Sequence, residues 1–382
     1  MVSQRAREVT PFIAMDVLER ANEMEDVVHL EVGEPDFSPP EAVTETAVDS
    51  LRAGNTNYTA ARGKPELRRA IADRYAREYG VDVDPGRIVV TPGSSPGLLL
   101  AMAALVDPGE EVVLTDPHYA CYPNFVRTVG GRVKTVPLYA ADGFEPRLSD
   151  FEAAVDEGTR ALLLNSPANP TGAVMDGDTL ASLVGLADAN GATVVADEVY
   201  HGLSYGVEEH SVLEYTDDAF VLDGFSKRFA MTGWRLGWMV VPPTYVDAVN
   251  RLAQNVLICA PNFVQDAGVA ALNTPADRLD AIRETYRARR DRLVGAVEDW
   301  GLDLGYTPGG AYYLLADVSD LPGDSLEVAD LLLAEAGVAV TPGVDFGDRA
   351  ADYLRLSYAT DLESIEAAIE RIGRVLETVD RA

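Results

Sequence analysis

Lysine is scarce in this chain of 382 residues: only Lys64, Lys134 and Lys227 occur, although lysine and arginine together number 31. Cysteine is scarcer still. Cys121 and Cys259 alone cannot form a disulfide framework, which favours a reducing cytoplasm. The four histidines show no metal-ligand spacing, so we predict no metal site. The chain has no apolar run of about 18 residues, and its first residues, MVSQRAREVTPF, contain no signal-peptide core. We expect neither a membrane span nor a leader.

Positive charge is also in short supply. The chain has 31 basic and 62 acidic residues, for a net charge of −31. Such a surface would not neutralise the phosphates of a nucleic acid, which argues against nucleic-acid binding. The acidic residues are dispersed along the chain, and together with the low lysine content this favours a halophilic protein. In molar salt, screening over about 3 Å suppresses self-repulsion. An acidic protein without salt adaptation is the alternative.

Short apolar runs alternate with helical patterns through the first two thirds of the chain. The runs end in turn residues and are typical of buried strands; they cover 87–93, 111–117, 161–167, 192–198, 220–226 and 238–242. Helical patterns occupy 95–106, 176–190 and 244–254. This alternation predicts an α/β fold with a mostly parallel sheet and helices on both faces.

The last third has a different order of elements. A long charged helix is predicted over 276–300, followed by the apolar run GGAYYLLADV and an amphipathic helix near 325–336. The segments VAVTPG and YLRLSYA and a terminal helix complete the chain. We interpret this part as a smaller α+β domain that begins near residue 280.

Polar side chains follow five of the predicted strands. They are Ser94 with Ser95, Tyr119, Asn165 to Asn169, Asp197 with Tyr200, and Lys227 with Arg235. Ligands of open α/β sheets bind beyond the carboxyl ends of the strands, so we expect these groups to meet at one edge. Each group also has a purely structural explanation: a helix cap, a plain loop, a satisfied buried acid or a solvated turn residue.

Together these groups suit one cofactor. A lysine partly removed from water can lose its proton and attack a carbonyl, forming a Schiff base. Arg235 and a serine-rich helix start can hold a phosphate. A buried carboxylate can pair with a protonated pyridine nitrogen, and an aromatic ring can stack on a flat heterocycle. These are the requirements of pyridoxal 5′-phosphate. Arginine cannot replace Lys227 in this role, because its guanidinium stays protonated.

Seven segments carry a resemblance that spans nearly the whole chain: LEVGEPDFSPP (30–40), NYTAARGKPELRRAIADRY (57–75), TPGSSPG (91–97), NSPANPTG (165–172), ADEVY (196–200), SKRFAMTGWRLG (226–237) and YLRLSYA (353–359). In this order and spacing they resemble the fold-type I pyridoxal-phosphate enzymes of the aminotransferase class I and II family, aspartate aminotransferases among them. The resemblance implies an arm, 1–40, that packs with the small domain. It also implies a large domain, 41–279, with a mostly parallel seven-stranded sheet, and a small domain, 280–382.

The resemblance also implies roles for single residues. Lys227 would form the Schiff base and later move the proton. The other cofactor contacts would be Asp197 at the pyridine nitrogen, Tyr200 and Asn169 at the phenolic oxygen, Tyr119 on the ring face, and Ser94, Ser95 and Arg235 at the phosphate.

The substrate and the neighbouring subunit are implied in the same way. Arg355 would bind the substrate α-carboxylate, helped by Asn169 and the backbone of Gly33. Tyr58 would reach the phosphate of the neighbouring subunit, so a homodimer with shared sites is expected. Arg62 could face a second substrate carboxylate, solvent or the dimer partner. Phe12 and Ile13 could form an apolar lid or pack on the small domain.

The implied activity is transfer of an amino group between an amino acid and a 2-oxo acid in a ping-pong mechanism. A C–S lyase or another pyridoxal-phosphate reaction is the alternative on this fold, and a non-catalytic amino-acid sensor is a third hypothesis. Two departures bear on cofactor affinity. Gly224 stands where many relatives have serine, and Pro96 removes an N–H from the phosphate loop.

Overall fold

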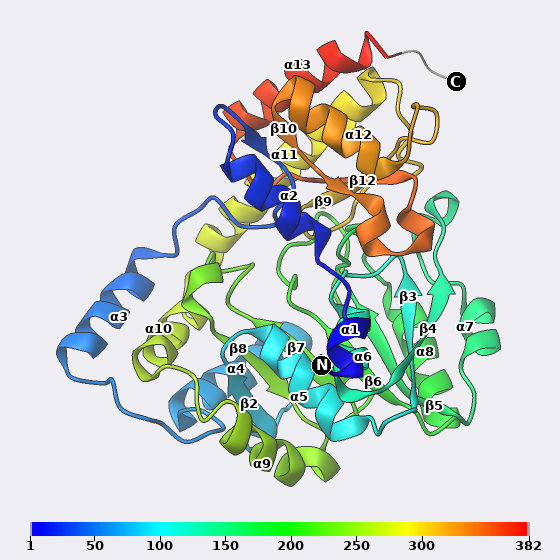
Figure 1. Ribbon diagram of the computed structural model, residues 1–382. Helices are drawn as coiled ribbons and strands as arrows, with labels where there is room; N and C mark the ends of the chain where they lie inside the picture. Colours follow the sequence, from blue (N-terminus) through cyan, green and yellow to red (C-terminus); the bar gives the residue numbers. More distant parts are fainter. Residues whose placement is uncertain (1, 380–382) are drawn as a thin grey trace.

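A seven-stranded sheet forms the centre of the computed structural model, which describes residues 2–379 (Figure 1). The strands lie in the order β2-β8-β7-β6-β5-β3-β4. Their bounds are β2 Ile88–Thr91, β3 Glu111–Asp116, β4 Arg132–Pro137, β5 Thr159–Asn165, β6 Thr193–Asp197, β7 Phe220–Gly224 and β8 Gly237–Val240. Strand β8 alone runs opposite to the other six strands of this sheet. The predicted α/β class with a mostly parallel seven-stranded sheet is confirmed. Strand β4 was not predicted, because this edge strand has few buried side chains and no apolar run.

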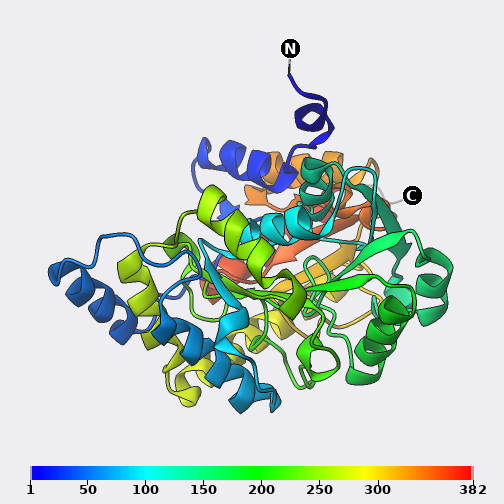
Figure 2. The same ribbon diagram turned by 90° about the horizontal axis from the view of Figure 1, so that it is seen from below.

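The strands bury both faces, because alternate side chains point to opposite sides. On β3, Val113 packs on one face while Val112 and Leu114 pack on the other. The first face is covered by α4 Pro65–Tyr79, α7 Leu148–Ala154, α8 Gly177–Ala189 and α10 Asn262–Leu272, and α3 Glu41–Arg52 packs on α10. The second is covered by α5 Ser94–Leu105, α6 Tyr122–Val129 and α9 Val246–Val256, as Figure 2 shows from below.

A second core lies above the large sheet in the view of Figure 1. It contains the antiparallel sheet β11-β12-β9, with β9 Tyr313–Asp317, β11 Thr341–Pro342 and β12 Tyr353–Ser357. Its helices are α11 Ala276–Asp299, α12 Ser325–Leu331 and α13 Leu362–Leu376. The helix predicted near 325–336 is α12 followed by a π-helical turn, Leu332–Ala336. Because α11 crosses residue 280 without a break, the domain boundary there remains a prediction.

The N-terminal segment contacts both parts of the molecule. Helix α1 Gln4–Glu8 lies beside α6, and the Thr10 amide donates to Asn124 Oδ1 at 3.1 Å. Helix α2 Ile13–Asn22 packs Val17 and Ala21 against Leu333 and Ala339. Strand β1 Val28–His29 then pairs in parallel with β10 Val338–Ala339. Within residues 2–379, no helix has the length and apolarity needed to cross a membrane.

Candidate active site

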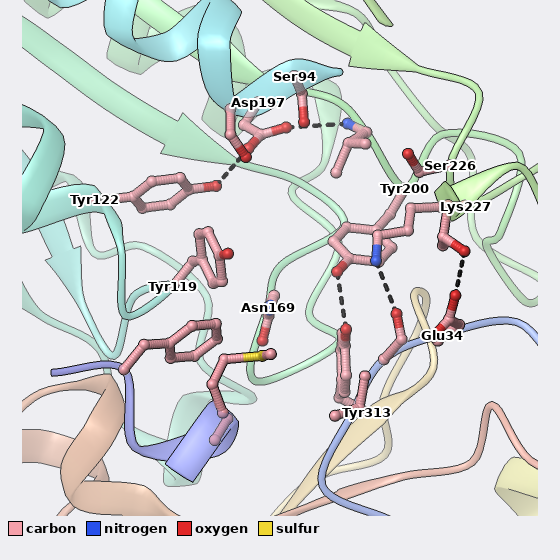
Figure 3. Close-up of a pocket in the computed structure, with 18 of the residues that line it drawn as sticks. Glu34, Ser94, Tyr119, Tyr122, Asn169, Asp197, Tyr200, Ser226, Lys227 and Tyr313 are labelled. Carbon is pink, nitrogen blue, oxygen red and sulfur yellow. Dashed lines mark hydrogen bonds between the residues drawn. The ribbon is translucent and has the colours of Figure 1, made fainter. Parts of the chain in front are cut away.

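The carboxyl ends of the parallel strands open onto one cavity of about 280 Å³ (Figure 3). Asn165 and Asp197 are neighbours in the register of β5 and β6, and β7 ends beside them at Gly224. Most of the residues selected from the sequence line this cavity: Gly33, Ser94, Ser95, Tyr119, Asn169, Asp197, Tyr200, Lys227, Arg235 and Arg355. Tyr58 does not line it and is 81% exposed. The individual roles remain predictions.

Lys227 brings a primary amine into the cavity from the turn after β7. Its Nζ donates to the carbonyl of Gly33 at 2.8 Å and lies 5.7 Å from the ring centres of both Tyr200 and Tyr312. The other two lysines are paired elsewhere: the Nζ of Lys64 lies 2.6 Å from Asp266 and that of Lys134 lies 3.5 Å from Asp156. Of the three lysines in the chain, all within the described part, only Lys227 lines the cavity.

Asp197 is a buried carboxylate at the end of β6. It accepts hydrogen bonds from Tyr122 Oη at 2.8 Å and from the Val199 amide at 3.2 Å (Figure 3). Burial raises the pKa of Asp197 to about 6, although these hydrogen bonds and the charge of Lys227 oppose the shift. No residue between 2 and 379 forms a salt bridge with Asp197. Such a carboxylate is suited to receive a cationic group from a ligand.

If the cavity binds a cofactor with a cationic group, replacing Asp197 with asparagine should therefore have opposite effects on the cofactor-free and cofactor-bound proteins. The folded-state pKa lies above the ordinary value of 3.8, so stability falls as the pH rises from 3.8 to about 6, and the full penalty is present at pH 8. At that pH, Asp197→Asn should stabilise the cofactor-free protein by about 1–3 kcal/mol. With cofactor bound it should destabilise, since the carboxylate's partner is then present. Urea unfolding of both forms at fixed salt tests this; a variant less stable in both forms contradicts it.

An anion site lies where β2 passes into α5. Ser94 and Ser95 begin the helix, and no side chain from the described residues caps it, so its first N–H groups are available to a ligand. Arg235 reaches this point from a left-handed backbone conformation, φ 53°. A Cβ at Gly93, itself at φ 99°, would lie 2.5 Å from Arg235 Nη2, so glycine permits the approach.

The two positions at which the sequence departs from the family pattern, Pro96 and Gly224, have local explanations. Pro96 is the third residue of α5, where its missing N–H breaks no intrahelical bond. A side chain at Gly224 would meet the Leu236 carbonyl at 3.2 Å. A hydroxyl reaches the cavity from Ser226 instead, a residue that the sequence analysis missed.

Arg355 lies at the opposite side of the cavity, on β12, and is 2% exposed. Its Nη1 donates to Asn169 Oδ1 at 3.0 Å, and its Nη2 donates to Thr341 Oγ1 at 3.2 Å and to the Glu31 carbonyl. The rings of Tyr313 and Phe346 lie 4.4 and 4.7 Å from its guanidinium carbon. Its Nε has no hydrogen-bond partner within residues 2–379. A buried N–H without a partner beside a cavity fits an incoming carboxylate.

The two N-terminal residues named from the sequence lie in different places: Phe12 lines the cavity, whereas Ile13 packs against the small cluster of Val17 and Leu333, and the apolar lid stays a prediction. Phe12, Ala14 and Met15 line the cavity, and Phe12 packs edge-on against Tyr119 with ring centres 5.8 Å apart. The two oxygens of Asp345 accept the amides of Ile13 and Ala14, each at 3.1 Å, and so cap α2 from a distant part of the chain. No local pattern identifies such a cap.

Arg62 does not face the cavity. It donates to the Gly86 carbonyl at 2.8 Å and is absent from the lining. Within this subunit it is therefore not placed to bind a second carboxylate of a substrate.

Tyr122, Thr232 and Tyr313 also line the cavity, and the sequence analysis missed all three. Tyr122 and Tyr313 stand in apolar surroundings that are typical of core residues, and both are about 2% exposed. Thr232 donates to Glu34, which also lines the cavity. Only the folded chain brings these groups to the site.

Comparison with known proteins agrees with this geometry. The family model for aminotransferases of class I and II matches residues 25–372. The chain belongs to this family. A valine–pyruvate aminotransferase of Mycobacterium tuberculosis is 39% identical over 373 residues, 96% of each chain. A (5-formylfuran-3-yl)methyl phosphate transaminase of Methanocaldococcus jannaschii is 35% identical over 384 residues, 98% of this chain and 100% of that one.

A solved structure extends the likeness to three dimensions. The aspartate aminotransferase of Thermus thermophilus with maleate superposes with a TM-score of 0.94 at 38% identity, covering 98% of this chain and 99% of that chain. This protein is thus an aminotransferase, an enzyme that transfers nitrogenous groups. The relatives' names differ in substrate, so the substrate must be argued from the site.

Proposed function

We propose that this aminotransferase binds pyridoxal 5′-phosphate in the cavity and exchanges an amino group between an L-amino acid and a 2-oxo acid in a ping-pong mechanism. The observation that carries the proposal is the meeting of the Lys227 amine, the buried Asp197 carboxylate and the partnerless Arg355 Nε around one cavity. The cofactor would supply an aldehyde for the Schiff base and a ring that accepts electrons from the substrate.

Each end of the cavity would hold one part of the cofactor. The first turn of α5, with Ser94, Ser95 and Arg235, would bind the phosphate. Asp197 would hold a proton on the pyridine nitrogen, since a cation removes the cost of burying its charge. Tyr119 would cover the ring face, and Tyr200 and Asn169 would hydrogen-bond the phenolic oxygen.

The substrate would bind on the opposite side. Arg355, with Asn169 and the Gly33 backbone, would take the α-carboxylate, and the substrate amine would then lie on the side of the cavity that holds the Lys227 amine. Lys227 would then be free to move the Cα proton. Fixing the carboxylate and the amine orients the Cα–H bond toward Lys227.

Separate half-reactions test the proposed function. An amino acid alone should change the visible spectrum of the purified protein and yield one equivalent of 2-oxo acid. A different 2-oxo acid should then restore the spectrum, whereas an unchanged spectrum would contradict the proposal. Steady ammonia release without an acceptor would replace transfer by the lyase reaction.

We also propose a homodimer with shared sites. Tyr58 is 81% exposed and does not line its own cavity, and Leu51 and Ile258 are exposed apolar residues, 44% and 50%. A cleft between α3 and residues 230–235 adjoins the active site, because Glu34, Thr232 and Arg235 line both. A second subunit on this face would complete the phosphate end of each cavity.

Mixing two defective variants tests the shared site. If Tyr58 serves the partner, a mixed dimer of Lys227→Ala and Tyr58→Ala subunits contains one intact site and one doubly defective site. Random subunit exchange should then restore activity at about a quarter of the sites. Each variant alone is the control. No recovery in dimers shown by sedimentation to have exchanged would mean that Tyr58 serves its own subunit.

The acidic surface supports a further proposal, adaptation to high salt. Even if every basic residue paired with one acidic residue, 31 acidic residues would remain uncompensated. Several surface arginines are already paired within their helix, such as Arg69 with Glu66 and Arg283 with Asp280. A cytoplasmic location also remains a prediction; Cys121 and Cys259 are both free thiols.

The melting temperature should rise by several degrees between 0.1 and 3 M potassium chloride, because salt screens the repulsion between uncompensated carboxylates. Sucrose at matched osmolality is the control, since it is excluded from surfaces without screening charge. A melting temperature that stays flat or falls in the salt series would refute the adaptation, as would an equal rise in sucrose.

A further inference from the structure

Tyr313 contacts three groups of the proposed site at once. Its hydroxyl lies 3.0 Å from the Tyr200 hydroxyl (Figure 3), and its ring centre lies 4.4 Å from the Arg355 guanidinium carbon. Any Cβ at Gly33 would overlap the Tyr313 hydroxyl, so this glycine leaves the space that the tyrosine occupies. Tyr313 is 2% exposed and begins β9, directly after Ala311 and Tyr312.

The backbone before Tyr313 is specialised. Ala311 has a left-handed conformation, φ 54°, which is uncommon for a residue with a side chain. The two tyrosines that follow diverge: Tyr312 Oη donates to the Gly33 carbonyl at 2.9 Å, whereas Tyr313 turns to Tyr200 and Arg355. The Gly33 carbonyl also accepts the Lys227 amine. Tyr313 thus stands among the groups proposed to bind cofactor and substrate.

We propose that Tyr313 is a positioning residue that joins the cofactor-oxygen contact of Tyr200 to the carboxylate contact of Arg355. The inference rests on the proposed function. Tyr200 has a single hydroxyl proton, and donating it to the cofactor's phenolic oxygen leaves none for Tyr313. The Tyr313 hydroxyl must then donate to Tyr200. This polarises Tyr200 and makes it a stronger donor to the ionised phenolic oxygen.

The ring of Tyr313 has a separate task. A guanidinium held against an aromatic face keeps its plane and gains a cation–π attraction. Phe346 lies against the same guanidinium, and Asn169 and Thr341 bond its edges. The plane of Arg355 is therefore set before a carboxylate arrives. Hydroxyl and ring act on different partners, so they can be separated by substitution.

Two variants of the holoenzyme separate the tasks. Tyr313→Phe keeps the ring against Arg355 and removes the hydroxyl. We expect the pH midpoint of the cofactor's visible absorbance change to move upward by roughly 0.5–1 unit, the scale of one neutral hydrogen bond. We expect kcat to fall about three- to tenfold. KM should change less than about threefold, and so should the dissociation constant of 3-phenylpropionate, an unreactive monocarboxylate. Tyr313→Leu removes both groups. It should shift the midpoint equally and also weaken 3-phenylpropionate binding about five- to thirtyfold.

Tyr358→Phe is the control, because it removes a buried hydroxyl from the same core without touching the cavity. If Tyr313→Phe leaves the midpoint where the control leaves it, the hydroxyl has no role toward Tyr200 and the inference is wrong. The same holds if both Tyr313 variants weaken carboxylate binding equally. A wild-type protein with no cofactor absorbance would instead overturn the proposed function on which the inference rests.

Discussion

Lys227→Ala is expected to lower turnover by at least about a thousandfold and to remove the visible absorbance of the covalently held cofactor. The alanine lacks the amine that we propose to form the Schiff base and to move the substrate proton. Lys227 is the lysine that lines the cavity, and its Nζ is held 2.8 Å from the Gly33 carbonyl, so no neighbouring lysine can substitute. Absorbance spectra and steady-state rates of the purified variant measure both effects.

Lys134→Ala is the matched control. Lys134 lies on the edge strand β4, where it pairs with Asp156, and it does not line the cavity. It should leave both the spectrum and the rate near those of the wild type. Small primary amines added to Lys227→Ala should restore part of the proton transfer, whereas they should not affect the control. A Lys227→Ala protein that turned over at near the wild-type rate would end the proposed mechanism.

Arg355→Lys is expected to lower kcat/KM by roughly tenfold to a few hundredfold in both half-reactions, the scale of a charged hydrogen bond. Lysine keeps the charge but loses the planar fork and the stacking on Tyr313 and Phe346. It also leaves Asn169 Oδ1 without its donor. Amino acids and 2-oxo acids carry the same α-carboxylate, so both directions should suffer.

Cofactor binding should survive in this variant, because Arg355 is assigned to neither the phosphate nor the ring. Single-turnover spectroscopy of each half-reaction, together with a cofactor titration, measures the separate effects. If only one half-reaction is slowed, or if the cofactor is lost, Arg355 has a different role.

The residues at the strand ends could be predicted because they depend on local pattern. An apolar run followed by turn chemistry identifies a strand, and parallel strands present their carboxyl ends at one edge. Asp197 and Lys227 are therefore brought together by topology alone, and the structure places both at the same cavity. Arg355 was predicted from the family motifs alone. It lies on β12 in the second sheet, so the rule about the carboxyl ends of parallel strands does not apply to it.

The misses share a cause. Strand β4 lies at the edge of the sheet, where it has few buried side chains, and its sequence lacks an apolar run. The helix predicted near 325–336 changes to a π-helical turn at Leu332, which a period of 3.6 residues does not reveal. Asp345 caps α2 across more than 300 residues. Each depends on contacts between distant segments.

Taken alone, the sequence determined the chemistry available to this protein: a lone lysine after a strand, a carboxylate at the end of the preceding strand, an arginine far downstream and an excess of acidic charge. Only the tertiary structure decided which aromatic side chains serve that chemistry. Tyr122 and Tyr313 have the sequence context of core residues, and both are buried like core residues. Their hydroxyls act because folding directs one to Asp197 and the other to Tyr200. Burial makes an unpaired hydroxyl costly, so the partners that folding supplies determine what each tyrosine does.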